Sequence, residues 1–168
     1  MAKKKRPTFG KKIRVGFIGA GGIARHHMGL LDKFDDVKIV AASDPSEDAL
    51  KQCSEQFKIK DTYTDYKEML KEAKLDAVSI CTPNYLHAQP AIDALNLGIS
   101  VIVEKPMAMN AIEAQSMVDA AKKNDRLCVI GFQYRYGPES QTIKKYIDDG
   151  QFGKILYARC KALRRRGL

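Results

Sequence analysis

The sequence lacks the features that mark several special classes of protein. It contains no apolar run of about 18 residues, so it holds no candidate transmembrane helix. Its four cysteines form no CxxC motif and no Cys/His spacing typical of a metal site. The 168 residues are 45% apolar and 29% charged, which excludes a disordered or collagen-like chain. We therefore expect a soluble globular protein of about one domain, without a bound metal and without a membrane partner.

Acidic residues are absent from both ends of the chain. The net charge of +9 suggests at first an anionic partner such as nucleic acid. Residues 1–14 and 159–168, however, hold 12 of the 29 basic residues and no acid, which leaves −3 for the rest of the chain. The positive charge thus belongs to the two ends rather than to one face of a domain, and we expect no nucleic-acid partner.

The first residues also lack the apolar run of about 7–15 residues that a signal peptide requires. Pro7, Gly10, Lys11 and Lys12 stand where that run would lie. We predict a cytoplasmic protein in which residues 1–12 form a disordered, solvated basic leader. A nucleic-acid or nuclear-import patch is the alternative for this segment.

Short apolar runs and amphipathic stretches alternate along the remaining sequence, and they predict strands and helices in turn. Strands are expected at 13–18, 37–43, near 63, and at 77–81, 101–103, 127–130 and 155–163. Helices are expected at about 23–34, after Ser46, near 66–70, at 87–97 up to Gly98, after Asn110 and at 138–149. Runs that are apolar throughout should be buried on both faces, as in a parallel sheet. The sequence predicts an α/β fold, a Rossmann-type doubly wound, mainly parallel sheet with helices on both faces.

A glycine-rich turn joins the first predicted strand to the first helix. The segment Gly19-Ala20-Gly21-Gly22-Ile23-Ala24 matches the pattern G-x-G-x-x-A. Gly19 can form the tight turn, Gly21 lets a pyrophosphate approach the backbone, and Ala24 lets the helix pack closely on the sheet. The helix N-terminus offers N–H groups to the phosphates. We predict a dinucleotide site, although glycines also end strands without binding anything.

An acidic residue follows the second predicted strand. Asp44 lies 20 residues after Ala24, where a carboxylate can accept hydrogen bonds from the adenosine ribose and repel a 2′-phosphate. This favours NAD over NADP. Two alternatives stay open: Asp44 could merely cap the next helix, and Ser43 and Ser46 could help to hold a phosphate.

Three polar clusters follow later strands, at the edge of the sheet where open α/β folds bind ligands. They are Thr82-Pro83-Asn84 with His87 behind, then Glu104-Lys105-Pro106, then Gln133, Tyr134, Arg135 and Tyr136. Any one of them could be ordinary loop sequence. Three on the same rim indicate a site.

With these clusters in view, the sequence resembles the Gfo/Idh/MocA oxidoreductases, the family of glucose–fructose oxidoreductase and inositol dehydrogenase. The segments that carry the resemblance are Gly19-Ala20-Gly21, Thr82-Pro83-Asn84-Tyr85-Leu86-His87, Glu104-Lys105-Pro106-Met107-Ala108 and Gln133-Tyr134-Arg135. The resemblance covers nearly the whole chain after the leader. It implies an NAD(P)-dependent oxidoreductase that transfers hydride between a nicotinamide cofactor and a hydroxyl or carbonyl carbon of a sugar, cyclitol or related compound.

The resemblance also implies roles for individual residues. The glycine turn, residues 19–24, would surround the pyrophosphate, and Asp44 the adenosine ribose. Near the nicotinamide half, the cofactor would meet Thr82, Pro83, Asn84, His87, Glu104, Lys105 and Pro106. Within this set Glu104 would bind a ribose, and Pro106 would impose a rigid turn that is often cis in the family. Gln133 and Arg135 are further candidates for cofactor binding.

Lys105 is the candidate catalytic residue. Hydride transfer from an alcohol carbon requires that the hydroxyl lose its proton, and a lysine can assist this loss or stabilise the developing alkoxide. Its alternative is a structural ion pair with Glu104, which we disfavour because neighbours on a strand point to opposite faces. For His87 a structural role is the alternative, for Arg135 a surface ion pair. His26 and His27 receive no role.

Members of this family resemble two-domain proteins of about twice this length. We expect residues 13–150 to form the NAD(P)-binding domain and residues 151–168 to be the first-strand stub of a substrate domain that is largely absent. Such a chain should bind NAD and turn over little or no substrate. A sugar or polyol would bind through the missing domain, and the full-length parent would form homo-oligomers. A non-catalytic dinucleotide-sensing or interaction module is the alternative.

Overall fold

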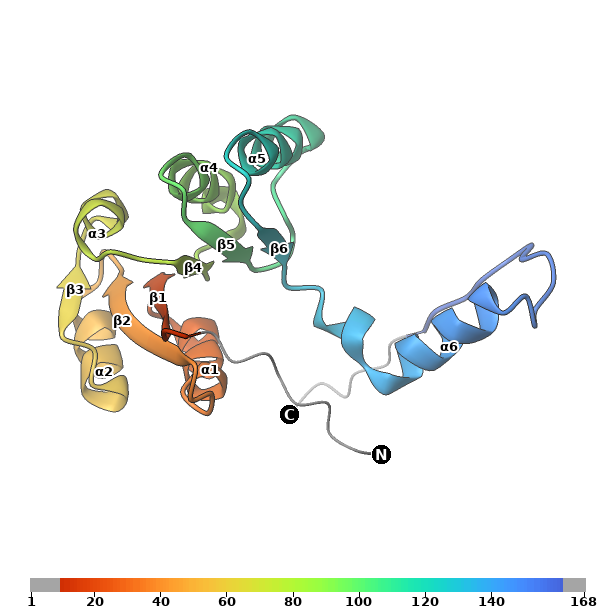
Figure 1. The fold of residues 1–168 in the computed structure, drawn as a ribbon, viewed down its shortest axis with the longest axis horizontal. Helices are drawn as coiled ribbons and strands as arrows, with labels where there is room; N and C mark the ends of the chain where they lie inside the picture. The colour runs from red at the N-terminus through yellow and green to blue at the C-terminus, as the bar shows by residue number, and fades with distance from the viewer. Residues whose placement is uncertain (1–9, 162–168) are drawn as a thin grey trace, which may run out of the picture. The chain divides into compact units, whose positions relative to one another are not determined.

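The computed structural model describes residues 10–161, and its core is one parallel sheet of six strands (Figure 1). The strands are β1 (Ile13–Ile18), β2 (Val37–Ser43), β3 (Asp61–Tyr63), β4 (Ala77–Ile80), β5 (Ser100–Val103) and β6 (Cys128–Ile130). Their order across the sheet is β3-β2-β1-β4-β5-β6, and every neighbouring pair is parallel. The order reverses at β1, so loops after β1 and β4 lie at the point where open α/β sheets bind ligands.

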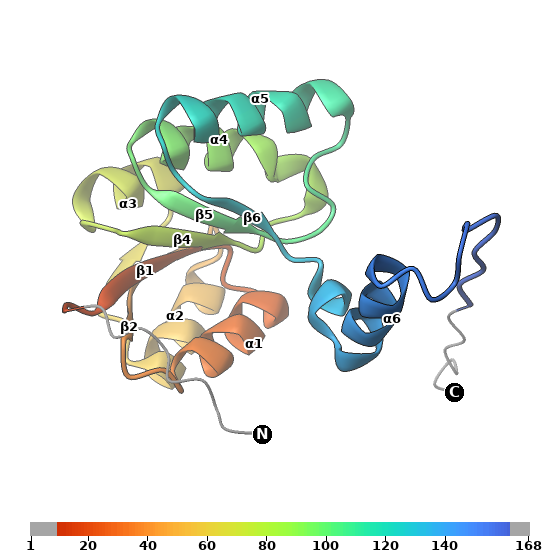
Figure 2. The ribbon, with the colours of Figure 1, turned by 45° about the vertical axis from the view of Figure 1, so that its right-hand side comes forward.

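Helices cover both faces of the sheet. They are α1 (Gly22–Leu31), α2 (Glu47–Phe57), α3 (Tyr66–Glu72), α4 (Ala88–Asn96) and α5 (Ala111–Lys123). The first two lie on one face, and the other three lie on the opposite face (Figure 2). The doubly wound Rossmann-type fold that the sequence predicts is confirmed.

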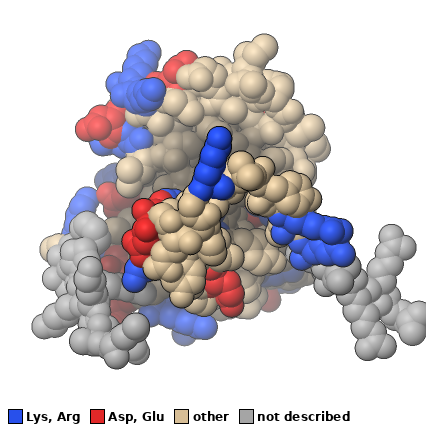
Figure 3. All heavy atoms as spheres, turned by 90° about the vertical axis from the view of Figure 1, so that its right-hand side faces the viewer, with Lys and Arg blue, Asp and Glu red and all other residues tan. Residues whose placement is uncertain are grey.

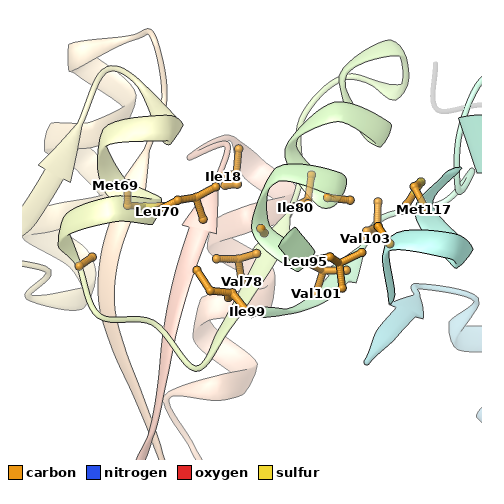
Figure 4. Packing of buried hydrophobic residues seen from close by; sticks show 14 of the residues in the cluster. Ile18, Met69, Leu70, Val78, Ile80, Leu95, Ile99, Val101, Val103 and Met117 are labelled. Carbon is orange, nitrogen blue, oxygen red and sulfur yellow. The ribbon is translucent and has the colours of Figure 1, made fainter. Parts of the chain in front are cut away.

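Each layer has its own apolar core. On one side Phe17 packs with Met28 and Cys53 of α1 and α2, and all three side chains are fully buried. On the other side a larger cluster joins the sheet to α3, α4 and α5, as Figure 4 shows. Val78, Ile80 and Val101 belong to it. The sheet is thus buried from both faces, as the continuous apolar runs predict.

The ends of several helices follow local sequence signals. Ser46 Oγ accepts a hydrogen bond from the Ala49 N–H at the start of α2, and Asn110 Oδ1 accepts one from the Glu113 N–H at the start of α5. Gly98 follows α4 with a φ of 76°, a left-handed conformation that favours glycine. These predictions are confirmed because capping depends on residues within one turn of the chain.

The chain divides into two units between Gly131 and Phe132, and the second unit contains a short 3-10 turn (Gln133–Tyr136) and α6 (Pro138–Asp148). This division comes before the boundary at residue 150 that the sequence suggests. The strand predicted at 155–163 is wrong for residues 155–161, which form no strand. A strand needs a neighbour for its backbone groups, and among the described residues this segment pairs with none. Residues 1–9 of the predicted leader and 162–168 of the predicted stub lie outside the described residues.

The described surface carries charges of both signs. On the face drawn in Figure 3, Lys and Arg side chains are interspersed with Asp and Glu. Within residues 10–161 no helix has the length and apolarity that crossing a membrane requires.

Candidate functional site

A cleft of about 560 Å³ lies at the carboxyl ends of the strands, between the loops that follow β1, β2, β3 and β4. Five residues of the predicted site line it: Gly19, Gly21, Asp44, Thr82 and Pro83. The remaining lining residues are Ile18, Ser43, Pro45, Thr64, Asp65, Tyr66, Cys81, Tyr85, Leu86 and Pro90. The switch in strand order therefore brings the glycine turn, the acidic residue and part of the first polar cluster together.

The glycine turn has the geometry that its sequence predicts. Gly19 has a φ of 92°, and a Cβ at this position would lie 2.8 Å from the carbonyl oxygen of Cys81. A Cβ at Gly21 would meet no atom within 4 Å. Ala24 is fully buried, so α1 approaches the sheet closely. The loop thus combines a tight turn with backbone that is open to the cleft.

The N-terminus of α1 faces the same loop. Gly22 and Ile23 belong to its first turn, where the N–H groups have no partner within a helix. No acidic residue stands in that turn, and no side chain caps it. An anion placed there would meet N–H donors and the positive end of the helix dipole.

Asp44 is held by two backbone groups. Its Oδ2 accepts a hydrogen bond from the Ala20 N–H at 2.8 Å, and its Oδ1 accepts one from the Ser46 N–H at 2.9 Å. The cap of α2 is Ser46, so the alternative that Asp44 merely caps this helix does not describe the structure. The carboxylate instead ties the glycine turn to the end of β2, and each oxygen keeps the capacity to accept a further hydrogen bond.

Sequence reasoning missed a second carboxylate in the cleft. Asp65 is the N-cap of α3, where its side chain accepts a hydrogen bond from the Lys67 N–H. The signal was present in the sequence, because Thr64 and Asp65 directly follow the third strand.

The Glu104-Lys105-Pro106 segment follows β5, one strand beyond the cleft. Glu104 is mostly buried, and Lys105 Nζ lies 4.0 Å from Glu104 Oε2 with 56% of the lysine side chain exposed. Lys105 and Glu104 do not point to opposite faces as expected, because β5 ends at Val103 and the alternation of a strand stops there. The Lys105–Pro106 peptide bond is cis, as the resemblance implies.

His87 is fully buried beneath the loops. Its Nδ1 lies 2.7 Å from the carbonyl oxygen of Pro106, and its Nε2 lies 3.0 Å from that of Thr82. The ring therefore joins the loop after β4 to the loop after β5. This geometry favours the structural alternative for His87, and we propose that it supports the rim from below.

The other predicted residues of the rim are placed as follows. Asn84 is exposed at the start of the 3-10 turn Asn84–Leu86. Gln133 and Arg135 belong to the second unit, where the Arg135 guanidinium lies 5.6 Å from the centroid of the Phe132 ring. A cofactor role for these three residues stays a prediction.

Sequence reasoning also gave no role to His27, which the structure places against Glu104. His27 Nε2 lies 3.2 Å from Glu104 Oε1. No local signal could have revealed this contact, because it joins α1 to the loop after β5 across β1 and β4.

The sequence is similar to those of known oxidoreductases. A family model described as an oxidoreductase family with an NAD-binding Rossmann fold, Gfo/Idh/MocA, matches residues 13–132. D-glucoside 3-dehydrogenase of Escherichia coli is 31% identical over 93% of this chain and 45% of its own length. Myo-inositol 2-dehydrogenase of Thermotoga maritima is 30% identical over 84% of this chain and 42% of its own length.

Solved structures of dehydrogenases have a similar fold. Scyllo-inositol dehydrogenase from Lactobacillus casei, with bound NAD(H) and scyllo-inositol, is 26% identical with a TM-score of 0.80, over 85% of this chain and 43% of that one. The WlbA dehydrogenase from Bordetella pertussis, in complex with NADH and UDP-GlcNAcA, is 30% identical with a TM-score of 0.81, over 85% and 44%. The chain spans less than half the length of these relatives.

Proposed function

The chain belongs to the Gfo/Idh/MocA oxidoreductase family, which has an NAD-binding Rossmann fold, and we propose that it provides the cofactor site of an NAD-dependent dehydrogenase. The reaction would move a hydride between the cofactor and a hydroxyl-bearing carbon of a sugar or cyclitol. The names of the relatives support this substrate class. Because the chain covers less than half of each, its substrate and its own turnover belong to the proposal.

The residues of the cleft fit a dinucleotide. The observation that carries the proposal is the link between Asp44 and the glycine turn, made by the hydrogen bond from the Ala20 N–H. It holds a ribose-binding carboxylate beside backbone that a phosphate can approach at Gly21 and at the first turn of α1. A cleft for a neutral ligand would not need an uncapped helix N-terminus beside an anchored carboxylate.

Two carboxylates argue for NAD rather than NADP. Asp44 and Asp65 both line the cleft, and both are anchored by backbone N–H groups. A ribose diol can donate hydrogen bonds to a carboxylate, whereas a 2′-phosphate would be repelled by both.

Lys105 is the residue that would accept or donate the proton of the substrate hydroxyl. When bound, the nicotinamide ring supplies the hydride acceptor or donor. The Lys105 side chain is largely exposed beyond the end of β5 and can reach a substrate hydroxyl, while Glu104 Oε2 holds its ammonium at 4.0 Å. Lysine at this place can take up the hydroxyl proton or stabilise the developing alkoxide.

Replacing Asp44 tests the cofactor site. Asp44→Ala should weaken NADH binding by about 10- to 100-fold, the loss of charge-assisted hydrogen bonds, and should weaken NADPH binding much less. Fluorescence titration of both nucleotides measures this. Asp48→Ala, which removes the same charge from an exposed position in the first turn of α2, is the matched control.

Two results would count against these assignments. Equal weakening of NADH and NADPH by Asp44→Ala would contradict the contact with the ribose. If the unmodified chain gave no saturable fluorescence change with either nucleotide, the cleft would not be a dinucleotide site.

A further inference from the structure

A network of polar side chains joins α1 to β4 and to the loop after β5. His27 stands at its centre. Its Nε2 lies 3.2 Å from Glu104 Oε1, and its Nδ1 lies 3.5 Å from Ser79 Oγ and 3.7 Å from Cys81 Sγ. About a quarter of the His27 side chain and 15% of the Glu104 side chain are exposed, so the contact is largely shielded from water.

The direction of the hydrogen bonds follows from the chemistry of the groups. A glutamate carboxylate only accepts hydrogen bonds, so the His27 Nε2–H donates to Oε1. Burial raises the pKa of the Cys81 thiol to about 11, so the thiol keeps its proton near neutral pH and can donate to Nδ1. The Ser79 hydroxyl lies on the same side and can also donate. Hydrogen-bond donors beside Nδ1 thereby favour the tautomer that carries its proton on Nε2, and this proton is donated to Glu104.

Neighbouring backbone also limits the positions that the Glu104 carboxylate can take. A Cβ on Gly131, at the end of β6, would lie only 3.0 Å from Glu104 Oε1. The other carboxylate oxygen, Oε2, lies 3.3 Å from the Lys105 backbone nitrogen and 4.0 Å from its Nζ. One oxygen is thus fixed by α1, and the other is turned toward Lys105.

We propose that His27 is a positioning residue for the nicotinamide side of the site, which it serves by holding Glu104 Oε1 so that Oε2 stays directed at Lys105 and at the cofactor ribose. The inference rests on the proposed function, because it assumes that Glu104 meets a dinucleotide. Without His27, Oε1 loses its hydrogen-bond donor, and the direction of Oε2 toward Lys105 is less firmly fixed.

The test separates the two halves of the dinucleotide. NADH contains the nicotinamide-side ribose, whereas ADP contains only the adenosine half. His27→Leu should weaken NADH binding by about tenfold and leave ADP binding within about twofold, because the contacts of Asp44 and the glycine turn are unchanged. His27→Gln should restore most of the loss, since its amide can donate in place of Nε2. His26→Leu, at the exposed neighbouring position on α1, should change neither affinity.

A double-mutant cycle adds a readout that a merely structural role would not move. If His27 acts through Glu104, His27→Leu should cause little further loss of NADH affinity in a Glu104→Ala background. Additive losses would overturn the proposal. Gly131→Ala provides a second route, because its Cβ should displace Oε1 and give the same NADH-selective loss even if His27→Leu fails to fold.

The outcomes distinguish the inference from the function on which it rests. If the unmodified chain does not bind NADH, both fall. If it binds NADH and His27→Leu binds NADH equally well, only the positioning role falls. A parallel loss of NADH and ADP affinity in both His27→Leu and Gly131→Ala would also overturn that role, since it would indicate general damage to the fold.

Discussion

Gly19 and Gly21 stand in one loop, yet their surroundings differ. Gly19 has a left-handed backbone, and its missing side chain makes room for the carbonyl of Cys81. Gly21 has an ordinary negative φ of −69° and open space where a side chain would point. The first glycine is therefore needed by the fold, whereas no atom of the described residues would contact a Cβ at the second.

Alanine at each position should separate these two cases. Gly19→Ala should lower the free energy of unfolding by about 2–4 kcal/mol through backbone strain and contact with Cys81. Gly21→Ala should change it by less than about 0.5 kcal/mol and weaken NADH binding, because its Cβ would stand where a pyrophosphate meets the backbone. Urea denaturation and NADH titration of both variants provide the measurements. A stable Gly19→Ala variant, or full NADH affinity in Gly21→Ala, would contradict this division.

At the scale of elements, α5 shows how strongly a few neighbouring residues define a helix end. Asn110 Oδ1 accepts from the Glu113 N–H at 2.9 Å, and Glu113 Oε2 accepts in return from the Met109 N–H at 3.1 Å. The reciprocal pair satisfies two backbone donors that would otherwise have no partner. The sequence predicts this cap because all its members lie within one turn.

Removing the cap should have a modest effect. Asn110→Ala should lower the free energy of unfolding by about 1 kcal/mol, since the Glu113 N–H loses its acceptor. Asn110→Ser keeps an oxygen that can accept this bond without placing a second carboxylate beside Glu113, whose Oε1 accepts from Asn110 Nδ2 at 2.9 Å, and it should leave stability nearly unchanged. Thermal unfolding of the two variants checks the difference, and equal stability of Asn110→Ala and the unmodified chain would show that the cap contributes nothing.

The strand predicted at 155–163 marks the limit of such local reasoning. Its apolar, β-branched and aromatic residues suit a strand, but Leu156 and Tyr157 are at least 80% exposed and residues 155–161 are unpaired among the described residues. A helix forms its hydrogen bonds within its own segment, whereas a strand takes them from another one. A strand-like sequence therefore predicts a strand only where a partner is within reach.

For the whole molecule, buried and partly buried thiols contribute to the response of stability to alkaline pH. Burial raises the pKa of the Cys81 thiol from its ordinary value of 9.0 to about 11. Burial also raises the thiol pKa of Cys53 and Cys128. Between pH 9 and 11 the unfolded chain has lost these protons while the folded chain keeps them, so rising pH favours unfolding.

Stability should therefore be retained below about pH 9 and decline as the pH approaches 11. Cys81 alone can account for up to about 2–3 kcal/mol of this loss. Urea denaturation at pH 7, 9 and 10.5 should show the decline in the unmodified chain and a smaller one in Cys81→Ala. Identical declines in the two proteins would contradict the pKa shift of this thiol.

The parts of the protein that local sequence alone determined are those that depend on near neighbours. Apolar runs located five of the six strands of the sheet, and Tyr63 marked the third, β3. Capping residues located the starts of α2 and α5, and the glycine turn and Asp44 located the cleft. Each of these features is formed by residues close in the chain or by the general rule that parallel strands end at one edge.

Only the tertiary structure decided which side chains meet across elements. The strand order sets α1 beside the loop after β5, and this brings His27 to Glu104 and leaves the ring of His87 beneath Thr82 and Pro106. Residues 155–161 have no strand partner among the described residues. Local sequence carries the conformational preference of each segment, but a contact between distant segments exists only after the sheet has assembled and its layers have packed.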